Sequence, residues 1–139
     1  MAVIFNIIGF LIAYLGAFTL LPMILAIIYR EATYPFLTSA LANLGLGIMM
    51  ILATRDDKKR LISKQELVSL SVILFLLLII LAAMPFFLSG QFSLNEAIFE
   101  ASSGLTTTGV SSQITVEKLP LSIIFWRAIF FYFSYFNIH

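Results

Sequence analysis

The sequence predicts an all-α integral membrane protein, built as a helical hairpin followed by a helix, a re-entrant pore loop and a last helix that is incomplete. Hydrophobic residues make up 61% of the 139 positions and charged residues 11%, whereas soluble domains are about one quarter charged. Long apolar segments recur at lengths near the roughly 20 residues that cross a bilayer core. A threonine-glycine run lies between two of these segments, directly after a short stretch of helical pattern.

The first two apolar segments predict a transmembrane hairpin over residues 1–54. Ala2–Ile28 carries no charge before Arg30 and is long enough to cross the membrane with some tilt. It lacks the basic start and the small-residue cleavage site of a signal peptide, so we expect a retained span. Phe36–Thr54 follows a very short link, which makes the two spans antiparallel. Its small residues suit close helix packing: Ala40, Ala42, Gly45 and Gly47.

The basic residues predict the orientation of the chain in an inner or plasma membrane. The loop 55–66 contains a cluster of them, namely Arg55, Lys58, Lys59, Arg60 and Lys64. Short cytoplasmic loops carry an excess of Lys and Arg, so we expect this loop and the N-terminus in the cytoplasm. Ser89–Lys118 is then external. The loop should also contact anionic lipid, and a net charge of +1 with basic residues confined to one loop indicates no nucleic-acid partner.

Residues 67–139 predict one helix, pore loop, helix repeat, truncated in its last helix. The spans are Leu67–Leu88 and Leu119–Ile138. Between them, Ser93 and Glu96 have the spacing of a capping box, so a helix should begin there. Apolar residues then recur at three- and four-residue spacing over about eleven residues, or roughly 16 Å, which is half of a bilayer core. Gly104 is expected to end this half-helix.

The run that follows the half-helix is Thr106, Thr107, Thr108, Gly109 and Val110. The chain must return outward here, and irregular backbone at membrane depth is tolerated only inside protein or beside a water-filled cavity. Backbone carbonyls and threonine hydroxyls can replace the hydration shell of a monovalent cation, and Gly109 permits a positive φ. We therefore predict an ion-selectivity filter at these five residues. The alternative is an ordinary external turn.

Four further residues are expected to support the filter: Glu100, Ser103, Gly104 and Arg127. Glu100 lies one turn after Glu96, so its carboxylate could accept hydrogen bonds from the filter backbone. Alternatively, it is a charge at the pore mouth with a general electrostatic influence. Arg127 lies in an apolar segment, where a charged side chain usually faces protein or water. Its alternative is to extend to the outer interface.

These residues carry a resemblance to the Trk/Ktr potassium-uptake transporters. The run Ala97–Gly109, then Leu119 with Pro120 and later Phe125–Arg127, is similar to the first pore-loop repeat of that family. The first span and the charged loop resemble its amino-terminal hairpin. The chain departs from the family after Phe133, where Ser134 to Asn137 stand in place of a glycine-rich stretch.

The resemblance implies a potassium-conducting membrane subunit, in which four such repeats surround one pathway. Potassium would be the transported ion, held at Thr107 and Thr108, with no covalently bound cofactor. The implied partners are membrane lipid, the remaining repeats of a longer chain, a second copy in a homodimer, and a cytoplasmic nucleotide-binding regulatory subunit.

The function expected from these observations is potassium uptake by the amino-terminal part of a Trk-type transporter. One alternative is a stand-alone cation channel, in which four copies each contribute one loop. Another is a fragment or membrane scaffold that does not conduct. No enzyme is expected, because the chain has no cysteine and the lone His139 has no partner at catalytic or metal-ligand spacing.

Overall fold

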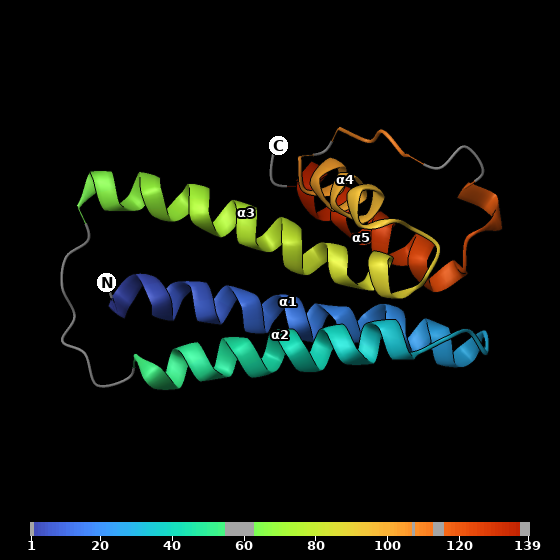
Figure 1. Cartoon of the computed structure of the whole chain (residues 1–139), viewed down its shortest axis with the longest axis horizontal. Helices are drawn as coiled ribbons and strands as arrows, with labels where there is room; N and C mark the ends of the chain where they lie inside the picture. The colour runs from blue at the N-terminus through green and yellow to red at the C-terminus, as the bar shows by residue number, and fades with distance from the viewer. Residues whose placement is uncertain (1, 55–62, 107, 113–115, 137–139) are drawn as a thin grey trace.

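The computed structural model is a bundle of helices (Figure 1) and describes residues 2–54, 63–106, 108–112 and 116–136. The elements are α1 Ala2–Ile28, α2 Tyr34–Ala53, α3 Lys64–Leu88, α4 Leu94–Leu105, the short 3₁₀ helix η1 Val116–Lys118 and α5 Leu121–Phe136. Helices α1, α2 and α3 are long and apolar enough to cross a membrane. The predicted class, an all-α membrane protein with a hairpin and a half-helix between two further helices, is confirmed.

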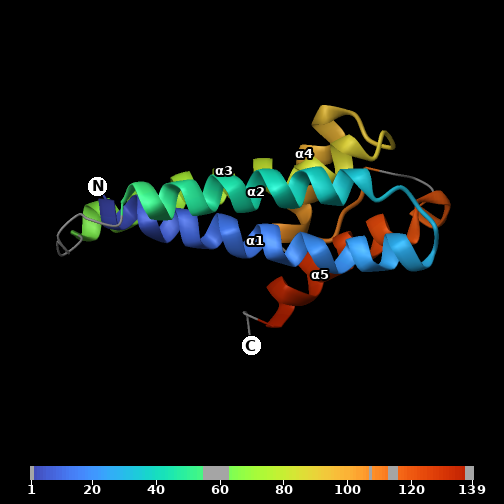
Figure 2. The same ribbon diagram turned by 90° about the horizontal axis from the view of Figure 1, so that it is seen from below.

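Helices α1 and α2 form a hairpin whose backbones nearly touch (Figure 2). A Cβ placed on Gly47 of α2 would lie 2.5 Å from the nitrogen of Ala13 and 2.6 Å from the oxygen of Gly9 in α1. Such close approach is possible only between residues without bulky side chains. The expectation of close packing is therefore confirmed for Gly47, and Ala40 is buried, whereas Ala42 and Gly45 are exposed and contact no other helix of this chain closely.

We expect Gly47→Ala to separate the hairpin helices. The added methyl group would meet backbone atoms, which cannot rotate away, and overpacking of this kind costs about 1–3 kcal/mol. Gly45→Ala is the matched control, because a Cβ at Gly45 meets nothing within 4 Å, and it should be neutral or slightly stabilising. Reversible unfolding of both variants in lipid or detergent measures the difference. Equal stability of the two would contradict the backbone contact at Gly47.

The element boundaries differ from the expected ones for local reasons. Helix α2 begins at Tyr34, two residues early, because Pro35 fits the first turn of a helix. Helix α3 begins at Lys64, three residues early, because Ser63 and Glu66 form a capping box that the sequence reading missed. Helix α5, Leu121–Phe136, begins two residues later than the expected Leu119, and the expected end at Ile138 lies outside the described residues. The basic residues at 55–60 lie outside the described residues.

The half-helix α4 and helix α5 gather at the end of α3 that lies beside the α1–α2 link (Figure 1). A core of buried side chains joins α1, α3, α4 and α5, with Phe86 of α3 and Trp126 of α5 both fully buried. The indole Nε1 of Trp126 donates to the carbonyl of Ala82 in α3 at 3.2 Å. This core fixes where α4 ends relative to the other helices, and so the position of the threonine-glycine run.

Candidate functional site: the end of the half-helix

The half-helix begins where the sequence predicts and ends one residue later than expected. Ser93 accepts a hydrogen bond from the Glu96 backbone, and Glu96 accepts one from the Ser93 backbone at 2.7 Å, so the predicted capping box is confirmed. Helix α4 has 12 residues, or about 18 Å at 1.5 Å per residue. That length stops well short of a full crossing.

Gly104 does not end the half-helix, contrary to expectation. It lies inside α4, which continues to Leu105, and Thr106 is the C-cap. A Cβ at Gly104 would lie 2.8 Å from the Cβ of Phe130 in α5. Gly104 is therefore required by the close approach of α4 to α5, not by a left-handed backbone.

The threonine-glycine run folds back on the last turn of α4. The Oγ1 of Thr106 donates to the carbonyl of Ser102 at 2.7 Å and lies 2.8 Å from the Oγ1 of Thr108. The backbone nitrogen of Thr108 donates to the carbonyl of Ser103 at 3.0 Å. Gly109 has a φ of +78°, the left-handed conformation that the sequence reading anticipated there. Thr107 lies outside the described residues.

The described residues of the run face away from the interior of the chain. Thr106, Thr108, Gly109 and Val110 are all exposed. Within the described ranges, no three His, Cys, Asp or Glu side chains gather as metal ligands. The oxygen atoms that the run offers are carbonyls and threonine hydroxyls, which suit a weakly held monovalent cation.

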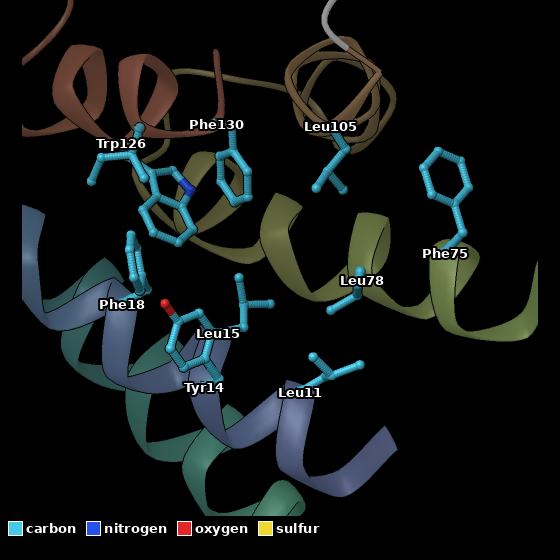
Figure 3. Close-up of a pocket in the computed structure, with 10 residues that line it drawn as sticks. Leu11, Tyr14, Leu15, Phe18, Phe75, Leu78, Leu105, Trp126 and Phe130 are labelled. Carbon is cyan, nitrogen blue, oxygen red and sulfur yellow. The ribbon is translucent and has the colours of Figure 1, made fainter. Parts of the chain in front are cut away.

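An apolar cavity of about 380 Å³ lies between α1, α3, the end of α4 and α5 (Figure 3). Leu105 projects into it from α4, opposite Leu15 of α1 and beside Phe130 of α5. A bare cation would lose its hydration there without replacement. The cavity is therefore unsuited to holding a cation.

Glu100 of α4 is 2% exposed and joins α4 to the chain after the run. Its Oε1 accepts from the backbone nitrogen of Ser112 at 2.7 Å and from the hydroxyls of Ser111 and Ser112 at 2.7 and 3.0 Å. Its Oε2 lies 3.0 Å from the Nε of Arg127 in α5. The Arg127 side chain is 14% exposed, so it turns to Glu100 rather than extending to the outer interface.

Ser103 also holds the chain where it returns from the threonine-glycine run. The hydroxyl of Ser103, which is buried, donates to the carbonyl of Val110 at 2.7 Å. Ser103 and Glu100 thus fix the two residues on either side of Ser111. The sequence pattern predicts roles for Glu100, Ser103 and Arg127 but not for Ser111 or Ser112, because the partners of these two serines are set by the tertiary fold.

Glu31, in the link between α1 and α2, was also missed. Its carboxylate accepts from the backbone nitrogens of Leu121 and Ser122 at 2.7 and 2.9 Å and from the Ser122 hydroxyl at 2.5 Å. Burial raises the pKa of Glu31, but the hydrogen bonds from Ser122 and Leu121 outweigh it, so the pKa lies below the usual value. One feature of the sequence indicates such a contact. Pro120 precedes α5, and its side chain cannot accept a hydrogen bond from the first turn of the helix, so the acceptor must come from another residue.

Fold and site together define a class, a helical membrane protein with a re-entrant loop between two helices. The comparisons agree with this class. No family model matches the chain. It is 34% identical over 126 residues to an uncharacterized cation transporter of Methanocaldococcus jannaschii, covering 90% of this chain and 26% of that protein. It is 30% identical over 132 residues to the Trk system potassium uptake protein TrkH of Escherichia coli K12, covering 93% and 27%.

A solved structure shows the same arrangement. The crystal structure of the potassium transporter TrkH from Vibrio parahaemolyticus matches with a TM-score of 0.87 and 29% identity, over 96% of this chain and 29% of that one. The expected resemblance to Trk-type potassium uptake proteins is therefore confirmed. The chain spans about a quarter of the length of the curated relatives it matches.

Proposed function

We propose that this chain is the amino-terminal part of a Trk-type potassium uptake transporter, and that Thr106–Val110 is one segment of its selectivity filter. The observation that carries the proposal is the end of α4. A half-helix too short to cross the membrane leads into an exposed threonine-glycine run, and Ser103 and Glu100 hold the returning chain. The relatives named TrkH support potassium as the ion.

In this proposal the run replaces the hydration shell of potassium with carbonyl oxygens, at Thr107 and Thr108 in particular. The positive φ of Gly109 lets neighbouring carbonyls turn toward the same side. The C-terminal end of α4 adds its partial negative charge on the approach to the ion. Glu100, Ser103, Gly104 and Arg127 support the geometry and do not bind the ion.

The exposed face of the site requires neighbours to complete the pore. Besides the run itself, Ile98 and Phe99 of α4 are exposed, which is typical of a surface that packs against another part of a protein. We propose that the remaining repeats of a longer polypeptide cover this face. The N-terminus would be cytoplasmic, and a second copy and a cytoplasmic nucleotide-binding subunit would join the assembly.

Growth of a potassium-uptake-deficient bacterium on limiting potassium tests the proposal. The strain would express either this 139-residue chain alone or a chimaera in which the chain replaces the matching part of Vibrio parahaemolyticus TrkH. Rescue by the chimaera only is the expected result. Rescue by the short chain would indicate a self-assembled channel, and a well-expressed chimaera that fails to rescue would leave the chain as a scaffold without transport activity.

A further inference from the structure

We propose that Glu31 is a positioning residue for the filter: it fixes the outer end of α5 to the amino-terminal hairpin, and thereby fixes Arg127 and Glu100. This inference rests on the proposed function for its effect on transport. The contacts themselves are independent of that function. The Glu31 carboxylate joins the segment between α1 and α2 to the start of α5. The Glu100 carboxylate joins Arg127 of α5 to the chain that follows the threonine-glycine run.

Helix α5 has no cap of its own. The first N–H groups of a helix have no acceptor within the helix, and helices α3 and α4 solve this with Ser63 and Ser93. At the start of α5 stands Pro120, whose carbonyl accepts from the nitrogens of Ile123 and Ile124, both at 3.1 Å. A proline side chain cannot accept a hydrogen bond, so the nitrogens of residues 121 and 122 need an acceptor from elsewhere.

Glu31 supplies that acceptor from 90 residues away in the chain. Its two oxygens each accept one of these backbone nitrogens, at 2.7 and 2.9 Å, and one also accepts the hydroxyl of Ser122, which is 1% exposed. A carboxylate at a helix N-terminus is further stabilised by the helix dipole. The arrangement caps α5 and ties it to the hairpin at the same time.

The backbone conformation at Arg30 sets the direction in which the Glu31 side chain extends. Arg30 has a φ of +55°, a conformation that costs a residue other than glycine free energy. The nitrogen of Arg30 donates to Ile27 at 3.3 Å and that of Glu31 to Ala26 at 2.8 Å, the two hydrogen bonds of a Schellman motif. Strain of this kind persists where the surroundings determine the conformation. Here the two hydrogen bonds hold Arg30 in this conformation and thereby fix the position of the Glu31 backbone.

A displacement of the start of α5 would reach the filter through Arg127. Arg127 lies six residues after Leu121, or about 9 Å along the helix axis. It pairs with Glu100 at 3.0 Å, and Glu100 binds the Ser112 backbone at 2.7 Å. Because a helix shifts as a rigid unit, loss of the Glu31 contact would alter the position of each of these groups.

The single tryptophan of the chain, Trp126, reports the position of α5 without any transport assay. We would reconstitute the 139-residue chain into phosphatidylcholine nanodiscs and measure Trp126 emission and its quenching by acrylamide. In Glu31→Gln, the amide NH₂ group faces one of the two backbone N–H groups and cannot accept its hydrogen bond. We expect the start of α5 to shift and the buried Trp126 to become more exposed, which gives a red shift of its emission and stronger quenching. Glu117→Gln, at an exposed glutamate of η1, is the matched control and should leave both unchanged. Identical spectra for all three proteins would overturn the inference.

Transport in the TrkH chimaera tests the effect on the filter. If the parent chimaera transports potassium, Glu31→Gln should reduce potassium over sodium selectivity by roughly tenfold at an unchanged amount of protein in the membrane, because a displaced Arg127 no longer positions Glu100 and the Ser112 backbone. Unchanged selectivity would overturn the inference while leaving the proposed function intact. A parent chimaera that does not transport would contradict the proposed function, and the emission of Trp126 would still decide the role of Glu31.

A second variant separates positioning from simple capping. In Glu31→Ala with Pro120→Asp, the aspartate caps α5 locally but provides no link to the hairpin. We expect selectivity to stay reduced in this double variant. Full recovery would mean that Glu31 only stabilises the helix end, and would overturn the positioning role.

Discussion

Glu100→Ala is expected to abolish selective potassium transport and to lower the stability of the site by about 3–5 kcal/mol, because it removes the buried carboxylate that pairs with Arg127 at 3.0 Å. It also removes the acceptor for Ser111 and Ser112, which hold the returning chain. The measurements are potassium and rubidium uptake by the chimaera with TrkH, and the amount of protein in the membrane. Wild-type uptake in this variant would contradict the supporting role of Glu100.

Two companion variants make the Glu100 result specific. Glu96→Gln removes a carboxylate one turn earlier on α4, while glutamine keeps the capping box with Ser93, so uptake should be unchanged. The double variant Glu100→Gln with Arg127→Gln removes both charges. It should give more folded protein than either of the two single variants. Selectivity should stay impaired in this pair, since Ser112 no longer meets a carboxylate.

The second large effect is expected at Gly109, where the backbone has a φ of +78°. Gly109→Ala forces a residue with a Cβ into the left-handed region at a cost of about 1–2 kcal/mol, and the run can relieve the strain by turning its carbonyls away from the ion. We therefore expect a loss of potassium selectivity of roughly tenfold or more, measured as the ratio of potassium to sodium uptake.

Gly90 provides the matched control for Gly109. It has a φ of +73° in the turn between α3 and α4, and a Cβ there meets nothing within 4 Å. Gly90→Ala introduces the same kind of backbone strain outside the filter. It should reduce stability slightly and leave selectivity unchanged. Equal effects of the two substitutions on selectivity would show that strain alone, and not the position of Gly109, causes the loss.

Local patterns were sufficient to predict much of the fold. The three long helices follow from runs of apolar residues, and the start of α4 follows from the spacing of Ser93 and Glu96, because a capping box involves only neighbours in the chain. The positive φ at Gly109 was also anticipated, because a glycine has no Cβ and adopts this conformation without a steric cost. The end of α4 was not, since Gly104 continues the helix and is small because of Phe130, a residue 26 positions away.

The candidate site was predicted only in its parts. Glu100 and Arg127 stood out as charges in an apolar chain, but the sequence left open whether Arg127 faces protein or the outer interface. The pairing at 3.0 Å depends on how α5 lies against α4, which no local pattern encodes. Glu31 was missed altogether, because its partners are 90 residues away.

The sequence by itself therefore determined the membrane class of this protein, its helices, the capped half-helix and the threonine-glycine run, since each depends on hydrophobic runs or on contacts between near neighbours. Only the tertiary structure decided which face of the run is exposed, how Glu100 and Arg127 meet, and that Glu31 caps α5. The pairing of Glu100 with Arg127 depends on a buried charge finding a partner across helices, because an unpaired charge inside the protein would cost too much free energy. The Glu31 contact depends on the backbone N–H groups at the start of α5 finding an acceptor 90 residues away in the chain.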